Sequence, residues 1–371
     1  MPDNKPTLLV IPGDGIGPEV IRQANRVIEW FETHRKRAFD VKEGHLGVAA
    51  YERFGVMMPD ETLAQAQSAD AILFGAVGGD GYDDIPIDVR RDQGLLALRK
   101  RLDLFANIRP AVALDALLDA SSLKPEVVRG VNLIIVRELS SGIYFGEPRG
   151  IEDLGGGVRR GFNTMQYTTP EIHRVARLSF ELAKARRNNL CSIEKSNVLE
   201  TSKLWRAEVR KIHEAEYPDV DLTELIVDAA AMQIIRNPGQ FDVIVTGNMF
   251  GDILSDAAAM LTGSLGMLPS ASLSEPDAGG RRNALYEPVH GAAPDIAGED
   301  KANPLAAILS FAMALRHSFD AAEDADLLES AVSDAVASGV RTADIKGDAT
   351  EAVSTTQMGD AVLESLNRLA A

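Results

Sequence analysis

Short apolar runs alternate with longer helical patterns along most of this chain of 371 residues. Helical stretches have apolar residues three and four apart, whereas the short runs have the length and β-branched content of buried strands. This alternation predicts an α/β fold in which helices cover a sheet. The length suits two domains or one large α/β domain. The expected strands are 7–11, 70–75, 131–137, 222–227 and 241–246, and the expected helices are 18–34, 170–187, 200–215, 248–262 and 304–318.

The first predicted strand ends in a glycine-rich turn, "LLVIPGDGIGPEV", at residues 8–20. A Rossmann turn needs G-x-G-x-x-G, but the third glycine here, Gly17, comes one residue early. The G-K-[ST] of a phosphate-binding P-loop is absent, and Glu29 and Glu32 lie in a helical pattern rather than at a strand end. A standard Rossmann fold is therefore not favoured. A tight turn whose glycines relieve backbone strain is the alternative, with a helix beginning at Pro18 or Glu19.

The composition is strongly acidic, with a formal net charge of −17 and a pI near 4.8. Such a surface repels nucleic acids and anionic membranes, so we expect neither as a partner. An anionic substrate would need a local group of arginines. A single cysteine, Cys191, permits no internal disulfide and fits a reducing compartment. With no signal-like N-terminus and no long apolar run, a cytoplasmic location is the expectation.

A pair of aspartates in "VIVTGNMFGDILSD" points to a metal site. Asp252 and Asp256 are four residues apart on a predicted helix, so they share a face and repel each other unless a cation lies between them. Oxygen ligands of this kind suit Mg²⁺ or Mn²⁺. Asp228, which opens another helix, is a third candidate. The alternatives are a solvated acidic face for the pair and a helix N-cap for Asp228.

Three arginines are candidates for binding an acidic ligand. Arg99 and Arg109 flank the segment "LDLFAN", and Arg137 ends an apolar strand. An arginine at a strand end can hold a carboxylate through two parallel hydrogen bonds. Surface salt bridges are the alternative interpretation for each of them.

A base and an acid for proton transfer are suggested by Lys195 and Tyr144. Lys195 follows the apolar run "LCSI", where partial desolvation favours the neutral form of an amine. Nearby arginine cations would also lower the pKa of Tyr144 towards working pH.

Two further segments lack clear periodicity. We expect residues 287–304 to form a loop of a length that is usually functional, in which Asp295 could bind a ribose diol, and 146–169 to be either a projecting hairpin or a flexible loop.

Taken in order, these segments resemble one family, the β-decarboxylating dehydrogenases that act on 3-isopropylmalate and isocitrate. The resemblance runs from "IPGDGIGPEV" to "GDATEAVSTTQMGDAV" and includes "LFANIRP", "RELSSGIYFGEPRG", "EKSNVLETSKLWR" and "EPVHGAAPDIAG". It implies a two-domain α/β fold with a mixed sheet rather than a Rossmann fold. The cofactor domain would comprise 1–104 and 263–371, and 105–262 would form the second domain, with an intersubunit arm at 151–169.

The resemblance also implies the roles of individual residues. Substrate carboxylates would be bound by Arg99, Arg109 and Arg137, and Mg²⁺ or Mn²⁺ by Asp252 and Asp256. Lys195, the base, and Asp228, a further ligand for metal and substrate, would enter from the other subunit of a homodimer, while Tyr144 would protonate C3. The NAD contacts would be His290, Gly291, Asp295, Ile296, Asn303 and Asn197.

Two local features bear on the choice of cofactor and substrate. NADP-using relatives place Lys and Tyr at the positions of Asp295 and Ile296, and a 2′-phosphate beside Asp295 would meet like charge, so NAD is expected. Leu95 and Leu96 offer an apolar wall for an isopropyl group, which favours 3-isopropylmalate and hence leucine biosynthesis. Relatives usually have Glu at the position of Asp92, so tartrate, a smaller alkylmalate or isocitrate stay as alternatives.

Two other classes of function were weighed against an enzyme. A non-catalytic subunit of a hetero-oligomeric relative would be expected to lose catalytic or metal residues, whereas this chain keeps all of them. A simple nucleotide-binding module would leave the arginine and carboxylate groups unexplained.

Overall fold

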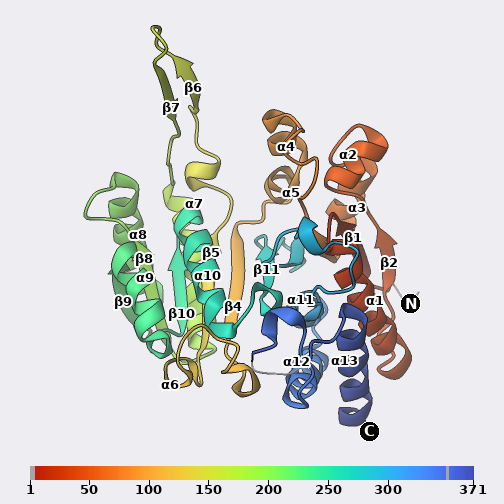
Figure 1. Cartoon of the computed structure of the whole chain (residues 1–371). Helices are drawn as coiled ribbons and strands as arrows, with labels where there is room; N and C mark the ends of the chain where they lie inside the picture. The colour runs from red at the N-terminus through yellow and green to blue at the C-terminus, as the bar shows by residue number, and fades with distance from the viewer. Residues whose placement is uncertain (1–4, 348–350) are drawn as a thin grey trace. The chain divides into compact units, whose positions relative to one another are not determined.

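Two units make up the computed structural model, which describes residues 5–347 and 351–371 (Figure 1). The first unit contains the chain up to Leu104, then Arg109–Val131 and Ala259–Ala371. The second contains Phe105–Ile108 and Asn132–Ala258. We expected 105–262 to form one domain, but 109–131 and 259–262 belong to the first unit.

Local hydrogen bonds explain why the segment 109–131 joins the first unit. The Ala113 N–H donates to the Val131 carbonyl at 2.9 Å, which closes the segment on itself. The Ser121 hydroxyl donates to the Met260 carbonyl at 3.0 Å, and the Arg341 guanidinium donates to the segment at 2.5 Å. These partners come from the C-terminal third of the chain and could not be read from the segment itself.

The first unit is built on a mixed sheet in the order β2-β1-β3-β12-β11. The β11–β12 pair is antiparallel, while β1 pairs in parallel with β2 and β3, and β12 with β3. The central strands are buried on both faces, which explains their nearly continuous apolar sequences. The strands are β1 (Thr7–Gly13), β2 (Asp40–Glu43), β3 (Ala71–Ala76), β11 (Pro269–Leu273) and β12 (Ala284–Pro288).

Amphipathic helices cover this sheet and complete its core. The longest is α1, which packs Val20, Ile28 and Phe31 inward. The helix α11 is apolar on every side, in keeping with its burial between the sheet, α1 and α12. The helices are α1 (Gly17–His34), α2 (Val48–Phe54), α3 (Asp60–Ser68), α4 (Ile87–Gln93), α5 (Leu95–Arg101), α6 (Pro125–Val128), α11 (Leu305–His317), α12 (Ala322–Ala337) and α13 (Thr355–Leu369).

The glycine turn after β1 is a site of close backbone approach. Gly13 and Gly15 have φ angles of +75° and +56°, which favour glycine. A Cβ on Gly15 would lie 2.1 Å from the Ala292 carbonyl oxygen, and one on Gly17 2.2 Å from that of Pro12. The helix α1 begins at Gly17, with Pro18 in its first turn. The glycines therefore serve the packing of the turn, as the alternative to a Rossmann fingerprint predicted.

The second unit is built on four parallel strands in the order β5-β10-β8-β9. Its core lies between this sheet and α7 and α8, around Phe180, Trp205 and Val209. The strand β4 (Ala106–Val112) contributes residues to both units. The other elements are β5 (Asn132–Glu138), β8 (Asn189–Glu194), β9 (Asp221–Ile226), β10 (Val243–Thr246), α7 (Thr169–Lys184), α8 (Glu200–Glu216), α9 (Val227–Arg236) and α10 (Asn248–Thr262).

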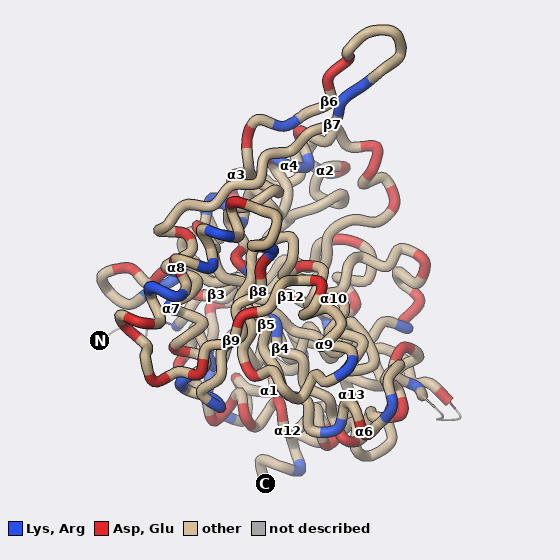
Figure 2. Tube along the Cα trace, turned by 90° about the vertical axis from the view of Figure 1, so that its left-hand side faces the viewer, with Lys and Arg blue, Asp and Glu red and all other residues tan. Residues whose placement is uncertain are grey.

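A two-stranded hairpin extends away from the helices of the second unit (Figure 1). It consists of β6 (Gly150–Asp153) and β7 (Arg159–Phe162), so the segment 146–169 contains a hairpin rather than only a flexible loop. Acidic residues on β6 face basic residues on β7 (Figure 2), and Arg160 pairs with Glu152 at 2.6 Å. Its apolar side chains Ile151, Leu154 and Val158 are more than half exposed.

Within the described ranges, no helix is both long and apolar enough to cross a membrane.

Candidate active site

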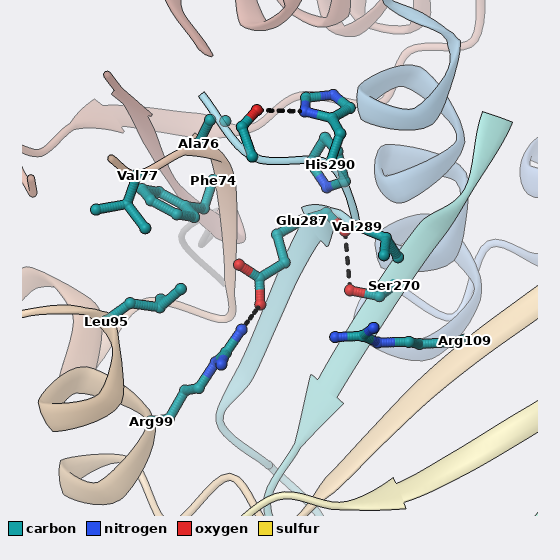
Figure 3. A pocket seen from close by; sticks show the side chains of 13 residues that line it. Phe74, Ala76, Val77, Leu95, Arg99, Arg109, Ser270, Glu287, Val289 and His290 are labelled. Carbon is teal, nitrogen blue, oxygen red and sulfur yellow. Dashed lines mark hydrogen bonds and ion pairs between the residues drawn. The ribbon is translucent and has the colours of Figure 1, made fainter. Parts of the chain in front are cut away.

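A pocket of about 180 Å³ lies in the first unit, at the end of β3 (Figure 3). It brings together five residues that the sequence predicted for substrate or cofactor binding, and it adds Glu287, which the sequence interpretation missed. An acidic residue at the end of an apolar strand, "ALYEP", was the available signal. The lining residues are Phe74, Gly75, Ala76, Val77, Leu95, Arg99, Arg109, Ser270, Glu287, Pro288, Val289, His290 and Gly291.

Arg99 and Glu287 form an ion pair on the wall of this pocket (Figure 3). Arg99 Nη2 lies 2.5 Å from Glu287 Oε1, and the side chains are only 11% and 7% exposed. Arg99 Nε is buried and has no hydrogen-bond partner among the described residues. A buried guanidinium donor without a partner is costly, so a ligand carboxylate would offset that cost.

His290 presents an acceptor beside the same pocket. Its Nδ1 lies 3.0 Å from the Gly291 carbonyl, which can only accept, so Nδ1 carries the proton. Burial lowers the pKa of the imidazole, which keeps the ring neutral. Its Nε2 is buried without a partner in the part of the chain that the structure describes. A ligand with a hydroxyl or amino donor would satisfy this atom.

The remaining predicted cofactor residues lie in different settings. Asp295 and Ile296 form a short turn, Pro294–Ile296, in which the Asp295 side chain is exposed. Asn197 is exposed in the turn after β8, in the second unit. The segment 287–304 is not a loop throughout, because Glu287 and Pro288 end the strand β12.

Asn303 is committed to the protein itself. Its Nδ2 donates to Asp344 Oδ2 at 3.0 Å, and its Oδ1 accepts from the Leu305 N–H at 3.0 Å, close to the start of α11. These bonds give the side chain a role in ordering the loop. Contact between Asn303 and NAD stays a prediction.

The glycine turn and the segment after β12 lie against each other. The Ile16 N–H donates to the Ala292 carbonyl at 2.8 Å. Because protein backbone occupies the space above Gly15, the turn is not arranged as a dinucleotide cradle. It instead fixes the segment that carries His290 and Asp295.

In the second unit, Arg137, Tyr144 and Asp252 form a cluster, here called the Arg137 cluster. Arg137 is only 3% exposed, and its Nη1 contacts Asp252 Oδ1. The Tyr144 hydroxyl donates to Asp252 Oδ2 at 3.0 Å, and the Arg137 guanidinium carbon lies 5.6 Å from the centre of the Tyr144 ring. The end of β5, the turn after it and the first turns of α10 therefore meet at one place.

The pKa of Tyr144 is raised, not lowered as we expected from nearby arginines. Burial is the largest cause, followed by the negative charge of Asp252 and the hydrogen bond to it. Arg137 acts in the opposite direction but is outweighed, and Asp256 adds to the increase. The phenol therefore stays protonated at neutral pH, but the shift makes it a weaker acid than we expected.

Lys195 and Asp228 form a second ion pair, here called the Lys195 pair. Nζ lies 2.6 Å from Asp228 Oδ1, and the side chains are 27% and 57% exposed. The hydrogen bond from Lys195 is the main cause of a lowered pKa of Asp228. Ile226 is the N-cap of α9, so the N-cap interpretation of Asp228 is wrong, although its charge lies favourably in the first helical turn.

The carboxylates predicted to bind a metal are divided between these two groups. Asp252 and Asp256 lie one turn apart on α10, and both charges act on Tyr144. Within residues 5–347 and 351–371, no three His, Cys, Asp or Glu side chains are placed to hold a metal ion. All the predicted donors are carboxylate oxygens, which fit Mg²⁺ or Mn²⁺.

The residues predicted to choose the substrate side group lie on α4 and α5. Leu95 lines the pocket, and Leu96 is partly buried on the same helix. Asp92 is 61% exposed and makes a bidentate ion pair with Arg91 at 2.7 and 2.9 Å.

Comparison with known proteins identifies the class. The family model described as isocitrate/isopropylmalate dehydrogenase matches residues 7–362. The chain belongs to this family. Among solved structures, an isocitrate dehydrogenase from Methylococcus capsulatus has a TM-score of 0.83 at 34% identity, covering 97% of this chain and 99% of that one. A β-decarboxylating dehydrogenase from Thermococcus kodakarensis has a TM-score of 0.76 at 35% identity, covering 98% of this chain and 96% of that one.

More similar sequences carry a particular name. The 3-isopropylmalate dehydrogenase of Paramagnetospirillum magneticum is 59% identical over 362 residues, which is 98% of either chain. The 3-isopropylmalate dehydrogenase of Rhodospirillum rubrum is 56% identical over 371 residues, the full length of both chains.

Proposed function

We propose that the chain catalyses the NAD-dependent oxidative decarboxylation of (2R,3S)-3-isopropylmalate to 4-methyl-2-oxopentanoate and CO₂, a step of leucine biosynthesis. The observation that carries this proposal is the similarity, over nearly the whole chain, to proteins named 3-isopropylmalate dehydrogenase. The structure adds support, because candidate groups for binding an anion and transferring a proton lie in two charged clusters and one pocket.

Arginines would bind the two carboxylates of the substrate. Arg99 and Arg109 line the pocket of the first unit, and Arg137 lies at the end of β5 in the second. Their planar forks can each hold a carboxylate through two hydrogen bonds. They would provide the local positive charge that a protein of net charge −17 needs to hold a dianion.

The side chains of this chain indicate which metal ion and which cofactor it would bind. Asp252 and Asp256, with Asp228 of the partner subunit, would hold Mg²⁺ or Mn²⁺, which stabilises negative charge on substrate oxygens when bound. His290, Gly291, Asp295, Ile296, Asn303 and Asn197 would hold NAD⁺, the hydride acceptor. The exposed Asp295 carboxylate suits a free 2′-hydroxyl and would repel the 2′-phosphate of NADP.

Two side chains would move the protons. Lys195, directly or through water, would take the proton of the C2 hydroxyl while C2 loses its hydride. Loss of CO₂ from the resulting 2-oxo acid leaves C3 with an electron pair. Tyr144 would supply the proton to C3.

A homodimer would complete each site. The Arg137 cluster and the Lys195 pair lie at different places in one chain, and large apolar side chains near both are exposed. Val198 is 64% exposed beside Lys195, Met232 is 64% exposed on α9, and Ile253 is 59% exposed next to Asp252. In the proposed dimer, the partner chain would cover these side chains.

The proposal is tested by assaying purified protein with a panel of acids. We expect one NADH and one CO₂ per 3-isopropylmalate consumed, a preference for NAD over NADP, and no turnover after chelation until Mg²⁺ or Mn²⁺ is added. An ethyl-substituted malate, isocitrate and tartrate are the substrates for comparison. A higher kcat/KM for isocitrate or tartrate would overturn the substrate, and metal-independent turnover would overturn the chemistry.

A further inference from the structure

Asn248, the first residue of α10, is a fully buried polar side chain with no role in the proposed chemistry so far. It precedes Asp252 by four residues, so both side chains lie on the same face of the helix. Buried amides in proteins are normally hydrogen-bonded, and their partners show what they hold in place.

The Asn248 side chain joins two parts of the Arg137 cluster. Its Oδ1 accepts from Arg137 Nε at 2.9 Å. Its Nδ2 donates to the Leu139 carbonyl at 3.2 Å and to the Ser141 carbonyl at 2.9 Å. A guanidinium can only donate and a backbone carbonyl can only accept, so these partners allow one orientation of the amide.

Each of these bonds bears on a group that the proposed reaction uses. Fixing Arg137 at Nε determines where its Nη atoms point, and Nη1 contacts Asp252. Fixing the carbonyls of 139 and 141 determines the turn that leads into Gly142–Tyr144. The backbone N–H groups of the same turn are held by the buried Glu138 carboxylate, which accepts from Ser140 at 2.9 Å and from Ser141 at 3.0 Å.

We propose that Asn248 is a positioning residue that sets the spacing of Arg137, Tyr144 and Asp252. This inference rests on the proposed function, because it concerns the same site. Asn248 would act through Arg137 and the turn before Tyr144, without touching the reacting atoms. A displacement of about 1 Å in a catalytic group can cost roughly 100-fold in rate, which is the size of effect expected here.

The test compares Asn248→Ala and Asn248→Asp with a matched control, Thr246→Val. Thr246 is equally buried two residues earlier and lies beside Arg137 in the pairing of β10 with β5, but its hydroxyl donates to the Ile193 carbonyl of β8 at 2.8 Å. All three variants lose buried hydrogen bonds at the same strand-to-helix junction. Only the Asn248 variants lose hydrogen bonds to Arg137 or to the turn before Tyr144.

We expect Asn248→Ala to lower kcat/KM for 3-isopropylmalate by about 100-fold, while the KM for NAD changes by less than about threefold. Thr246→Val should lose stability but keep kcat/KM within about threefold per folded molecule. Asn248→Asp can still accept from Arg137, but when ionised it cannot donate to the two carbonyls. Its activity relative to wild type should therefore rise as the pH falls and one donor returns.

The outcomes separate this inference from the proposed function. Failure of the wild-type protein to oxidise 3-isopropylmalate would refute the function. An active wild type with both Asn248 variants no worse than Thr246→Val would refute the positioning role, as would a rise in the KM for NAD as large as the loss of kcat/KM for 3-isopropylmalate. If Asn248→Ala does not fold, Asn248→Asp and its pH profile decide the question.

Discussion

The Arg137 cluster and the Lys195 pair differ in how far their charged side chains are exposed to solvent. In the first, the cation is 3% exposed and meets Asp252, with Asn248 behind it. In the second, Lys195 is 27% exposed and Asp228 57% exposed. Both belong to the same unit, and both carry residues assigned to a single reaction.

Under the proposed function, this difference separates the part of the site that one chain orders from the part that a partner chain would complete. The Arg137 cluster is ordered by the buried hydrogen bonds of its own unit. The Lys195 pair is at the surface, where solvent screens it and an exposed apolar side chain, Val198, lies nearby. We infer that the pair acts on another copy's cluster, and the following predictions test that comparison.

The largest effect is expected on catalysis when either group is removed. Asp252→Asn removes a carboxylate proposed to hold the metal, and Lys195→Met removes the proposed base. Each should lower kcat by about 10³-fold, within the range for acid–base and electrostatic groups. Lys211→Met is the control, since Lys211 is 68% exposed and its carboxylate partner is 3.8 Å away. Steady-state rates for the three variants check this, and a surviving rate in either site variant would contradict the assignment.

Stability should respond unequally to the loss of the two groups. Arg137→Met leaves Asp252 and Asn248 without their buried partner and should cost about 3 kcal/mol of unfolding free energy. Lys195→Met breaks an exposed pair and should cost less than about 1 kcal/mol. Denaturant unfolding of both variants measures this. Equal losses would remove the distinction between an internally ordered cluster and a surface pair.

Several parts of this picture follow from sequence patterns. The expected helix 18–34 is observed at Gly17–His34 because its apolar periodicity is strong and Pro18 marks its start. The aspartate spacing on α10 and the arginine at the end of β5 were also visible. Such features depend on neighbours within one element, which a sequence displays directly.

Other features depend on partners far along the chain and were missed. The strand β11, "PSASL", alternates apolar and polar residues, a pattern typical of a strand with one solvated face, yet Ser270 and Ser272 are buried. The burial of Glu287 and the raised pKa of Tyr144 likewise come from residues distant in the sequence. No spacing rule reports desolvation or the partner of a buried polar atom.

The buried carboxyl group of Glu138 predicts that the free energy of unfolding depends on pH. Burial raises the pKa of Glu138, behind the Arg137 cluster, to about 7. Because its folded pKa lies above the unfolded value, its favourable contribution is complete below about pH 4.5 and is lost as the pH rises through about 7. The loss should be about 3 kcal/mol. Glu138→Gln should flatten the pH dependence of unfolding free energy between about pH 5 and 8, and an unchanged slope would contradict this.

The smallest effect is expected at a third, exposed pair, Arg91–Asp92. Asp92→Glu adds one methylene beside the helix that presents Leu95. The ratio of kcat/KM for isopropyl- and ethyl-substituted malates should change by no more than about tenfold. Competition assays with both acids measure the ratio. A change of a hundredfold or more would make Asp92 a main determinant of specificity.

Mixing two inactive variants tests most directly whether two chains build one site. Asp252→Asn and Lys195→Met protein, unfolded together in equal amounts and refolded, should form mixed dimers that each contain one intact site. About a quarter of wild-type activity per chain should return, while each variant refolded alone stays inactive. Mixed dimers that form but show no recovery would contradict the account, because each site would then lie within a single chain.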